Sequence, residues 1–501
     1  MPGSLPAEPR TVHEVSAGSL VKYAAVKILF VTSELAPFAK AGGLGDVGAA
    51  LPRHLARHGH DVRVFVPFYS RVSTDGRVFE TVDQVRDIQV SLGQHHVRFS
   101  LLRSTLPGSD LGVYFVFCPA LYHRPSIYTN DDDEHLRFLL LSKAAIVSAQ
   151  RMRFAPDIVH VNDWPTAVVP LMLNTEFRWD REIFERTKTV LTIHNLQYQG
   201  QFRADIVGET GFGPSAHLFH QDQLREGRVN FLVTGILYAD AITTVSPTYA
   251  REIQTPEQGA HLDGLLRARS GALYGILNGV DYEEWSPELD KHIPQRYAPE
   301  SLELKAKNRD VLLRKMGLPP APDAPVCGVV SRLAGQKGFD LMFEAAPHVL
   351  SRHDLRLVIL GSGERRYEEF FQQLSRGFPG KVCFYSGYNE GLAHLIEAGA
   401  DMFLMPSRYE PCGLNQMYSL KYGTVPVVRK TGGLADTVDD DTGFLFERFA
   451  PDALRAAWEL AIAAYHRRDL WRRLQLNGMA RDYSWDSQIR KYEAVYARLL
   501  G

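Results

Sequence analysis

The sequence has almost no net charge, and this absence narrows the range of possible partners. Its 501 residues contain 56 lysines and arginines against 58 aspartates and glutamates, a formal net charge of -2. Such a balance offers no overall attraction to nucleic acid or to an anionic membrane surface. We therefore expect no nucleic-acid partner, and any anion-binding site must be local.

Paired cysteines and long apolar runs are also missing. The cysteines lie far apart and form no C-x-x-C pair, which argues against zinc and disulfide frameworks; they are Cys118, Cys327, Cys383 and Cys412. No run approaches the roughly 20 apolar residues of a membrane-spanning helix, and the N-terminal segment lacks the apolar core of a signal peptide. We expect residues 1–25 to form a flexible tail and the protein to be cytoplasmic, with no membrane partner.

What the sequence does contain is a pattern of strands alternating with helices, which occurs twice. The first series of apolar, β-branched runs lies at 27–33, 61–67, 112–118, 157–163, 188–195 and 240–246, and helical patterns between them include 44–60, 133–152 and 228–239. The second series lies at 324–333, 355–363, 381–387, 401–407 and 424–430. Alternation of this kind predicts mostly parallel, doubly wound sheets.

A chain of this length is too long for a single core, so we expect two α/β domains facing a cleft. The segment 276–303 between the two series is rich in turn formers and charge, which is typical of an interdomain connection. We predict one domain over 26–280 and a second over 281–483. The oligomeric state stays open.

A glycine-rich stretch, "AGGLGDVG" at 41–48, contains Gly43, Gly45 and Gly48 at the G-x-G-x-x-G spacing of dinucleotide-binding loops. That fingerprint requires its first glycine directly after the first strand and an acidic residue at the end of the second. Here the first predicted strand ends near Ser33, ten residues before Gly43, and the second ends in Val-Pro-Phe. The pattern therefore argues against a NAD site.

The same glycines remain compatible with another anion. Gly42 and Gly43 would let backbone N–H groups approach a phosphate at a helix N-terminus, and Lys40 would add a full positive charge. The alternative is a tight turn in which the glycines serve only backbone geometry.

The second series carries candidate charges at the ends of its strands. Arg332 and Lys337 follow the strand at 324–333, where open α/β sheets place their ligands, and two unpaired cations there would suit a diphosphate. The alternative is a solvated loop with ordinary surface charge. Glu410 follows the strand at 401–407, and it could accept hydrogen bonds from sugar hydroxyls or act as acid, base or nucleophile. The alternative interpretation is that Glu410 is a structural cap.

Several further positions could offer polar groups to a ligand. Backbone N–H groups are expected at Cys412, Gly413 and Leu414, and a second glycine-then-helix pattern begins at Thr431 and Gly432.

In the first series, His194 and Asp163 end predicted strands, although a lone histidine is often structural. The acidic runs at 131–134 and 439–441 have no partners at metal-ligand spacing, so we expect solvated loops and no metal.

Taken together, these stretches resemble the serial motifs of bacterial glycogen synthases. The motifs are "KAGGLGDVGAALP", "TIHNLQYQGQF", "YGILNGVD", "VSRLAGQKG", "SRYEPCGLNQMYSLKYGTVPVVRKTGGLADTV" and "DYSWDS", in the order of that family. The resemblance extends from Lys27 to the C-terminus. It implies the GT-B fold, two Rossmann-like domains facing a cleft, with a closing helix at 484–501 that returns to the first domain.

The resemblance also implies roles for individual residues. Arg332 and Lys337 would neutralise the departing ADP diphosphate, Glu410 would hold the glucose hydroxyls, and His194 and Asp163 would lie beside the reacting centre. Donor contacts would come from Lys40, Gly42, Gly43, Asn278, Tyr388, Cys412, Gly413, Leu414, Thr431 and Gly432. Related transferases carry a second glutamate eight residues after the first, whereas this chain has Tyr418 there.

The function implied by the resemblance is that of a retaining hexosyltransferase. It would move glucose from ADP-glucose to the non-reducing end of an α-1,4-glucan such as glycogen, with no metal and no cofactor. Three alternatives stay open: UDP-glucose as the preferred donor, a glucan-binding relative without catalysis, and a nucleotide-dependent oxidoreductase.

Overall fold

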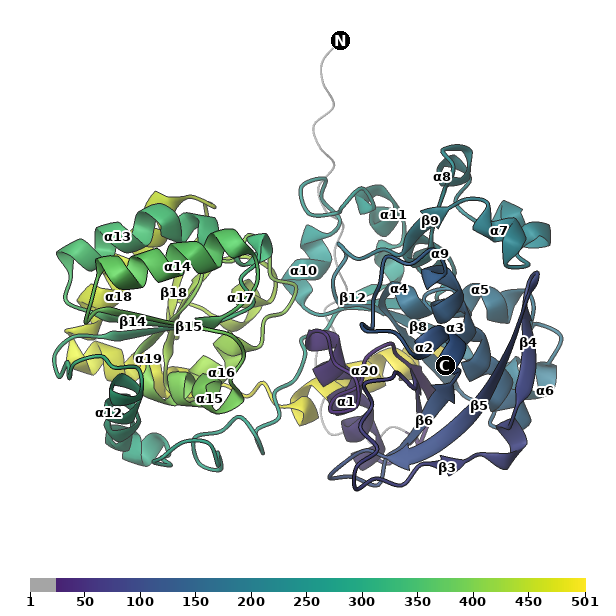
Figure 1. Ribbon diagram of the computed structural model, residues 1–501, viewed down its shortest axis with the longest axis horizontal. Coiled ribbons are helices and arrows are strands. Elements are labelled where there is room, and N and C mark those ends of the chain that lie inside the picture. The colour runs from purple at the N-terminus through teal and green to yellow at the C-terminus, as the bar shows by residue number, and fades with distance from the viewer. Residues whose placement is uncertain (1–23) are drawn as a thin grey trace, which may run out of the picture. The chain divides into compact units, whose positions relative to one another are not determined.

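A computed structural model describes residues 24–501 of the chain. The predicted tail at 1–25 lies outside these residues except for its last two. The chain forms two compact units (Figure 1). The first comprises the residues up to Val245, Ala250–Ile276 and Trp485–Gly501, and the second comprises Ser246–Tyr249 and Leu277–Ser484.

The first unit is built on a sheet with the strand order β12-β11-β8-β7-β1-β2-β6-β5-β3, in which β4 also pairs with β5. Its strands are β1 (Lys27–Val31), β2 (Asp61–Pro67), β3 (Glu80–Thr81), β4 (Ile88–Leu92), β5 (His95–Thr105), β6 (Gly112–Phe117), β7 (Ile158–Asn162), β8 (Lys188–Ile193), β11 (Ala241–Thr244) and β12 (Leu273–Gly275). All pairs from β12 to β6 are parallel, which confirms the predicted doubly wound arrangement.

Helices connect these strands, as expected for parallel neighbours that need crossover connections. They are α1 (Gly43–Arg57), α2 (Pro119–Tyr122), α3 (Glu134–Arg151), α4 (Asp163–Thr166), α5 (Val169–Asn174), α6 (Arg181–Phe184), α7 (Ile206–Glu209), α8 (Gln221–Arg225), α9 (Phe231–Tyr238), α10 (Pro247–Glu252) and α11 (Asp263–Ala268).

Two features of the first unit differ from the sequence prediction. The pattern at 228–239 predicts one helix, but Arg228–Asn230 forms β10, paired with β9 (Gln201–Arg203), before α9 begins. The side chain of Asn230 accepts a hydrogen bond from the Val233 N–H at 3.1 Å, so it caps α9 at the switch from strand to helix. The antiparallel strands β3, β4 and β5 are also absent from the prediction.

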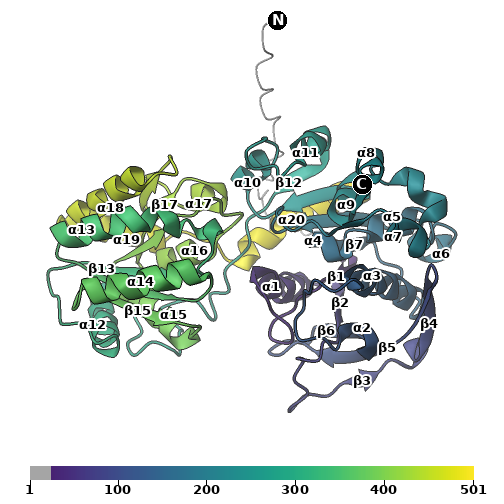
Figure 2. The ribbon, with the colours of Figure 1, turned by 45° about the horizontal axis from the view of Figure 1, so that its top comes forward.

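The C-terminal helix α20 (Trp485–Leu500) belongs to the first unit and lies beside α1 (Figures 1 and 2). Its Tyr496 hydroxyl lies 2.7 Å from Nδ1 of His160 on β7. Its Glu493 carboxylate lies 3.1 Å from His58 and 3.2 Å from His60. Burial opposes the charge of Glu493, but the hydrogen bonds from His60 and His58 hold its pKa below the usual value.

The second unit contains one parallel six-stranded sheet with the order β15-β14-β13-β16-β17-β18. Its strands are β13 (Val326–Val330), β14 (Arg356–Gly361), β15 (Val382–Ser386), β16 (Met402–Met405), β17 (Val425–Arg429) and β18 (Phe444–Phe446). The helices are α12 (Lys305–Lys315), α13 (Met342–Arg352), α14 (Arg365–Gly377), α15 (Glu390–Gly399), α16 (Asn415–Lys421), α17 (Gly432–Thr437), α18 (Pro451–Tyr465) and α19 (Arg468–Met479).

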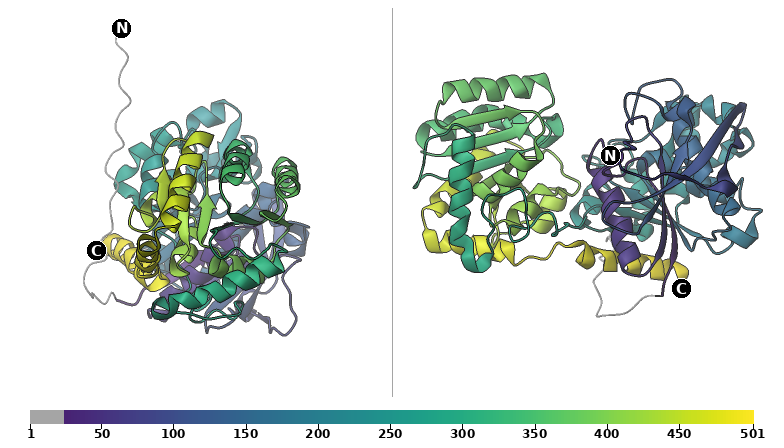
Figure 3. Two further views of the ribbon diagram at one scale, coloured as in Figure 1. Left: turned by 90° about the vertical axis from the view of Figure 1, so that its left-hand side faces the viewer. Right: turned by 60° about the horizontal axis from the view of Figure 1, so that its bottom comes forward.

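Helices cover both faces of this sheet, as the two views of Figure 3 show. Alternate strand residues enter two different cores, since successive side chains of a strand point to opposite faces. Leu357 and Ile359 pack with residues of α13, α14, α18 and α19, whereas Val358 and Leu360 pack with residues of α12, α15 and α17. This two-sided burial explains why the strands read as continuous apolar runs.

Within residues 24–501, none of the helices combines the length and the apolar character that crossing a bilayer requires.

Candidate functional site

The centre of the second unit's sheet is a topological switch point, where ligands of open α/β proteins bind. The chain order runs outward in one direction from β13 through β14 and β15, and in the other from β16 through β17 and β18. Arg332 and Lys337 follow β13, and Glu410 follows β16. Three predicted residues therefore leave two neighbouring strands at the same edge of the sheet.

A pocket of about 180 Å³ lies at this edge. Four predicted residues line it, namely Arg332, Lys337, Gly413 and Leu414. Ser407 and Asn415 also contribute to the lining. The Asn415 side chain donates to the Val330 carbonyl at 2.7 Å, which fastens the loop after β16 to the end of β13. The pocket therefore combines two cations with polar groups.

Lys337 and Glu410 form an ion pair in this region. The Lys337 Nζ lies 2.6 Å from Glu410 Oε2, and the Lys337 side chain is 20% exposed while that of Glu410 is 6% exposed. The Ser407 hydroxyl donates to the same carboxylate oxygen at 2.9 Å. The sequence interpretation of Lys337 as an unpaired cation is therefore wrong, because the fold brings residues 73 positions apart into contact.

Arg332 differs from Lys337. Its side chain is exposed, and within residues 24–501 its guanidinium has no hydrogen bond or ion pair. A guanidinium presents several N–H donors in a planar fork that matches phosphate geometry. Arg332 is therefore available to an anion that reaches the pocket.

The glycines at the start of α17 serve close packing. A Cβ on Gly432 would lie 1.9 Å from the Glu410 carbonyl oxygen, and one on Gly433 would lie 2.0 Å from that of Cys412. The Gly433 N–H donates to the Glu410 carbonyl at 3.1 Å. Side chains at these glycines would push α17 away from the segment that carries Glu410, so the glycines position this carboxylate.

The other predicted donor residues of this unit have different environments. Thr431 and Cys412 are buried, and burial raises the pKa of the Cys412 thiol to about 12. Asn278 is also buried, and its Oδ1 atom has no hydrogen-bond partner among the described residues. Tyr388 is 80% exposed just before α15, so its ring is accessible to a planar group.

In the first unit, the glycine loop encloses a carboxylate of the protein itself. The N–H groups of Ala41 and Gly42 donate to Glu34 Oε2 at 2.6 and 2.9 Å. Glu34 thus occupies the position predicted for a phosphate, and a phosphate would reach the Gly42 N–H only if the Glu34 side chain moved away. The sequence signal for Glu34 was its place just after β1, at the carboxyl edge of the sheet.

The other glycines of this stretch differ in how closely they are packed. A Cβ on Gly48 would lie 2.4 Å from the Glu34 carbonyl oxygen, whereas a Cβ on Gly42 or Gly43 would meet nothing within 4 Å. Lys40 forms an ion pair with Asp46 at 2.7 Å, and both side chains are more than 40% exposed. β1 ends at Val31 and α1 begins at Gly43, so these glycines do not follow the strand directly, as a dinucleotide loop requires.

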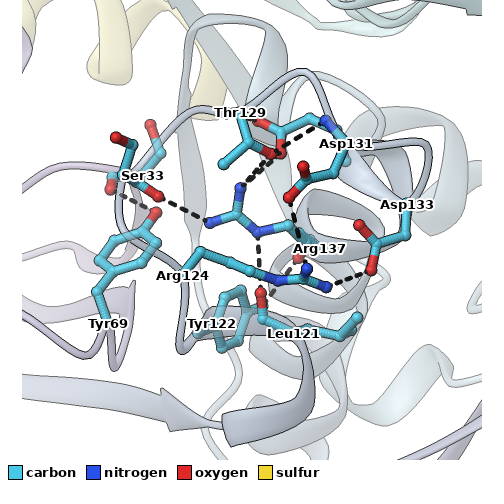
Figure 4. A network of polar contacts seen from close by, with 11 residues as sticks. Ser33, Tyr69, Leu121, Tyr122, Arg124, Thr129, Asp131, Asp133 and Arg137 are labelled. Atoms are coloured by element: carbon cyan, nitrogen blue, oxygen red, sulfur yellow. Dashed lines mark hydrogen bonds and ion pairs between the residues drawn. The ribbon is translucent and has the colours of Figure 1, made fainter.

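A buried arginine, drawn with its partners in Figure 4, supports the segment that contacts Glu34. Arg137 is fully buried, pairs with Glu134, and donates to the Leu121 carbonyl at 2.9 Å and to Thr129 Oγ1 at 3.4 Å. Between these anchors, the Tyr128 hydroxyl donates to Glu34 Oε1 at 2.8 Å. The chain of contacts therefore runs from the start of α3 to the glycine loop.

These contacts correct the interpretation of the first acidic run, 131–134, as a solvated loop. Glu134 is buried against Arg137, while Asp131 and Asp133 pair with Arg124 at 3.4 and 2.5 Å. The second acidic run, 439–441, is exposed, as expected for a solvated loop, and its Asp439 pairs with Arg481 at 2.6 Å. The carboxylates of 131–134 fix loop structure.

His194 and Asp163 lie together at the ends of β8 and β7. The Asn162 amide donates to the Val31 carbonyl at 3.0 Å, so its oxygen faces His194 Nε2 at 2.9 Å. Nε2 therefore carries the proton, and Nδ1 is an acceptor. Desolvation lowers the pKa of His194 to about 3, which keeps the ring neutral at physiological pH.

Asp163 is unusual in its backbone and its charge. It is buried, has a φ of 53°, and accepts a hydrogen bond from the His194 N–H at 2.7 Å. Burial raises the pKa of its carboxyl to about 7, against the opposing effect of N–H donors from His194 and Asn195. A strained, buried carboxyl that titrates near neutral pH is typical of a functional position.

Comparison with known proteins gives a consistent result over nearly the whole chain. Residues 27–268 match the family described as starch synthase catalytic domain, and residues 316–473 match glycosyl transferases group 1. The chain is 47% identical to a glycogen synthase of Myxococcus xanthus over 486 residues, covering 95% of this chain and 100% of that protein. It is 43% identical to a glycogen synthase of Thermotoga maritima, covering 95% and 99%.

Solved structures show the same relationship. The catalytic domain of starch synthase IV from Arabidopsis thaliana, bound to ADP and acarbose, superposes with a TM-score of 0.87 at 32% identity, covering 95% of this chain and 100% of that one. A sucrose-phosphate synthase from Thermosynechococcus elongatus gives a TM-score of 0.60 at 17% identity, covering 95% and 99%, which is a likeness of fold.

Proposed function

Because the chain belongs to the glycogen and starch synthase family of glycosyltransferases, with the two-domain GT-B fold, we propose that ADP-glucose is its donor. Glucose would pass to the 4-hydroxyl at the non-reducing end of an α-1,4-glucan, with retention of the anomeric configuration. The ADP in the starch synthase structure supports this choice of nucleotide.

The observation that supports a nucleoside diphosphate sugar as the donor is the Lys337–Glu410 pair beside the pocket at the switch point. A donor diphosphate would compete with Glu410 for Lys337 and would also engage the unpaired Arg332. A cation and a phosphate oxygen at about 4 Å attract each other by about 4 kcal/mol at an effective dielectric of 20. Even half of this attraction, realised as the diphosphate leaves, would accelerate transfer substantially.

Glu410 would then hold the transferred sugar. Once Lys337 turns toward the diphosphate, the carboxylate of Glu410 is free to accept hydrogen bonds from glucose hydroxyls. Ser407 would keep one of its oxygens in place through the existing 2.9 Å hydrogen bond. Backbone groups at Cys412, Gly413 and Leu414 would contact the same sugar, and Thr431 and Gly432 would help to fix the donor.

Residues of the first unit would serve the sugar and the acceptor. His194 is neutral, so its Nδ1 would accept a hydrogen bond from a glucose hydroxyl. Asp163 would lie near the reacting centre, and Lys40 would exchange its partner Asp46 for a donor phosphate. Gly42 and Gly43 would approach the donor. In the second unit, Tyr388 would lie against adenine, and the unpartnered amide oxygen of Asn278 would accept a hydrogen bond from the donor.

The transfer would need no metal and no cofactor, because Arg332 and Lys337 supply the positive charge at the leaving group. The bond from the glucose C1 to the diphosphate oxygen breaks as the bond from C1 to the acceptor O4 forms. The proton of the acceptor hydroxyl passes to the departing diphosphate oxygen. This route keeps attack and departure on one face of the sugar and balances the charge.

A coupled assay of nucleotide release with glycogen as the acceptor tests the proposal. The kcat/KM should be at least tenfold higher with ADP-glucose than with UDP-glucose. A higher value for UDP-glucose would overturn the donor assignment. Release of neither nucleotide, with glycogen binding retained, would instead favour the non-catalytic glucan-binding alternative.

A further inference from the structure

Three potential metal ligands lie together in the second unit, and none of them lines the switch-point pocket. They are His292, Glu390 and His394, whose ligand atoms all lie within 4.8 Å of one another. Glu390 and His394 are four residues apart on α15, a spacing that places both side chains on one face of the helix. His292 approaches from the segment that precedes α12.

His394 has a ring nitrogen without a partner. Its side chain is fully buried, and its Nδ1 lies 2.8 Å from Asp290 Oδ2. Because a carboxylate accepts, Nδ1 carries the proton and Nε2 retains its lone pair. This buried Nε2 has no hydrogen-bond partner among the described residues. A buried polar atom without a partner requires an explanation, and a bound ion is one.

The orientation of the His394 ring is fixed by the groups around it. Asp290 accepts hydrogen bonds from the Tyr422 hydroxyl at 2.6 Å and from the His292 N–H at 2.7 Å, so its carboxylate cannot turn away. The Trp285 ring stacks on His394 with centroids 3.7 Å apart and an angle of 13°. A histidine whose second nitrogen donates to a carboxylate is the usual form of a metal-binding imidazole.

We propose that His394 Nε2, His292 and Glu390 bind one divalent transition-metal ion of the zinc class. Two imidazoles and one carboxylate favour zinc or cobalt over magnesium or calcium, which prefer oxygen ligands alone. The fourth position of the ion would hold water.

The geometry is compatible with coordination after small side-chain movements. Bonds of about 2.0–2.2 Å in a tetrahedron place neighbouring ligand atoms about 3.3–3.6 Å apart. The ligand atoms, now within 4.8 Å, would therefore close by about 1.5 Å or less. His292 is half-buried and Glu390 is exposed, so both can move, and the exposed side gives the ion a path of entry.

The ion would act on structure and would take no part in the proposed transfer. It would join the segment at His292 to the start of α15, and this helix begins two residues after Tyr388. The sequence predicts no metal site, and the proposed site departs from that prediction. His292 and His394 lie about a hundred positions apart, and only the fold brings them together.

Cobalt binding to the full-length, chelator-treated protein tests this site, with visible absorption and titration calorimetry as readouts. We expect one equivalent of Co²⁺ to bind with the absorption of a tetrahedral or five-coordinate ion. His292→Ala and Glu390→Gln should each weaken this binding at least tenfold. His466→Ala, which removes an exposed histidine of the same unit, is the matched control and should bind as the unaltered protein does.

A second measurement guards against variants that fail to fold. Zn²⁺ should raise the Tm of the unaltered protein and of His466→Ala, but not that of His292→Ala, whose Tm without metal should be unchanged. Absence of stoichiometric cobalt uptake, or equal affinity in all four proteins, would overturn the site. The result is independent of glucose transfer, which is assayed separately in the presence of chelator.

Discussion

The strand ends of the two units present different chemistry. In the first unit, the His194 ring is neutral, Asp163 titrates near pH 7, and the glycine loop encloses Glu34. In the second unit, Lys337 and Glu410 form an ion pair beside an exposed Arg332. The second unit therefore presents two cations at its pocket, as expected where a diphosphate would bind. The neutral His194 ring in the first unit suits a sugar hydroxyl.

The largest loss of activity is expected when the negative charge of Glu410 in the second unit is removed. Glu410→Gln should lower kcat by about 100- to 1000-fold, because an uncharged amide accepts weaker hydrogen bonds and no longer balances Lys337. Steady-state assays with glycogen as the acceptor would measure this decrease in kcat. Glu303→Gln, an exposed position of the same unit, is the control. Activity within tenfold of the unaltered enzyme would reduce Glu410 to a structural cap.

Removal of the positive charge of Lys337 should lower activity less than the change at Glu410. Lys337→Ala should lower kcat/KM for ADP-glucose by about 30-fold, equivalent to about 2 kcal/mol of lost attraction to the diphosphate. The exposed Lys307→Ala provides the control. Thermal unfolding must show that the variant remains folded, since Glu410 loses its partner. An unchanged kcat/KM would remove Lys337 from the diphosphate site.

The packing role of the glycine loop predicts a contrast within the first unit. Gly48→Ala should destabilise the protein by about 1–2 kcal/mol, because the new Cβ would lie 2.4 Å from the Glu34 carbonyl oxygen. Gly42→Ala should have little effect on stability, since nothing lies within 4 Å of its Cβ. Denaturant unfolding compares the two variants, and equal losses would contradict the assigned roles.

The smallest effect concerns the titration of Asp163. Its folded pKa of about 7 lies above the unfolded value, so its contribution to stability is present at low pH and is lost as pH rises through 7. Relative to Asp163→Asn, the unaltered protein should lose about 1 kcal/mol of unfolding free energy between pH 6 and 8. Denaturant unfolding at several pH values measures this difference. If the difference in unfolding free energy does not vary with pH, the pKa of the Asp163 carboxyl lies in its ordinary range.

The sequence was sufficient for the architecture because parallel strands buried on both faces read as apolar runs. The runs at 27–33, 61–67 and 424–430 correspond to β1, β2 and β17 within two residues at each end. The antiparallel strands β3 to β5 escaped prediction, since β5 is half-exposed and mixes polar with apolar residues. The start of α9 was misjudged because Asn230 both ends a strand and caps the helix.

The positions of residues at strand ends identify candidate site residues, but not the groups that those residues contact. The sequence placed Arg332, Lys337 and Glu410 after strands of one sheet, since the carboxyl edge of a parallel sheet follows from strand order. Tertiary structure alone decided that Glu34 enters the glycine loop, that Lys337 pairs with Glu410, and that Asp290 orients His394. Side-chain partners distant in sequence depend on how elements pack, and no local pattern of residues encodes that packing.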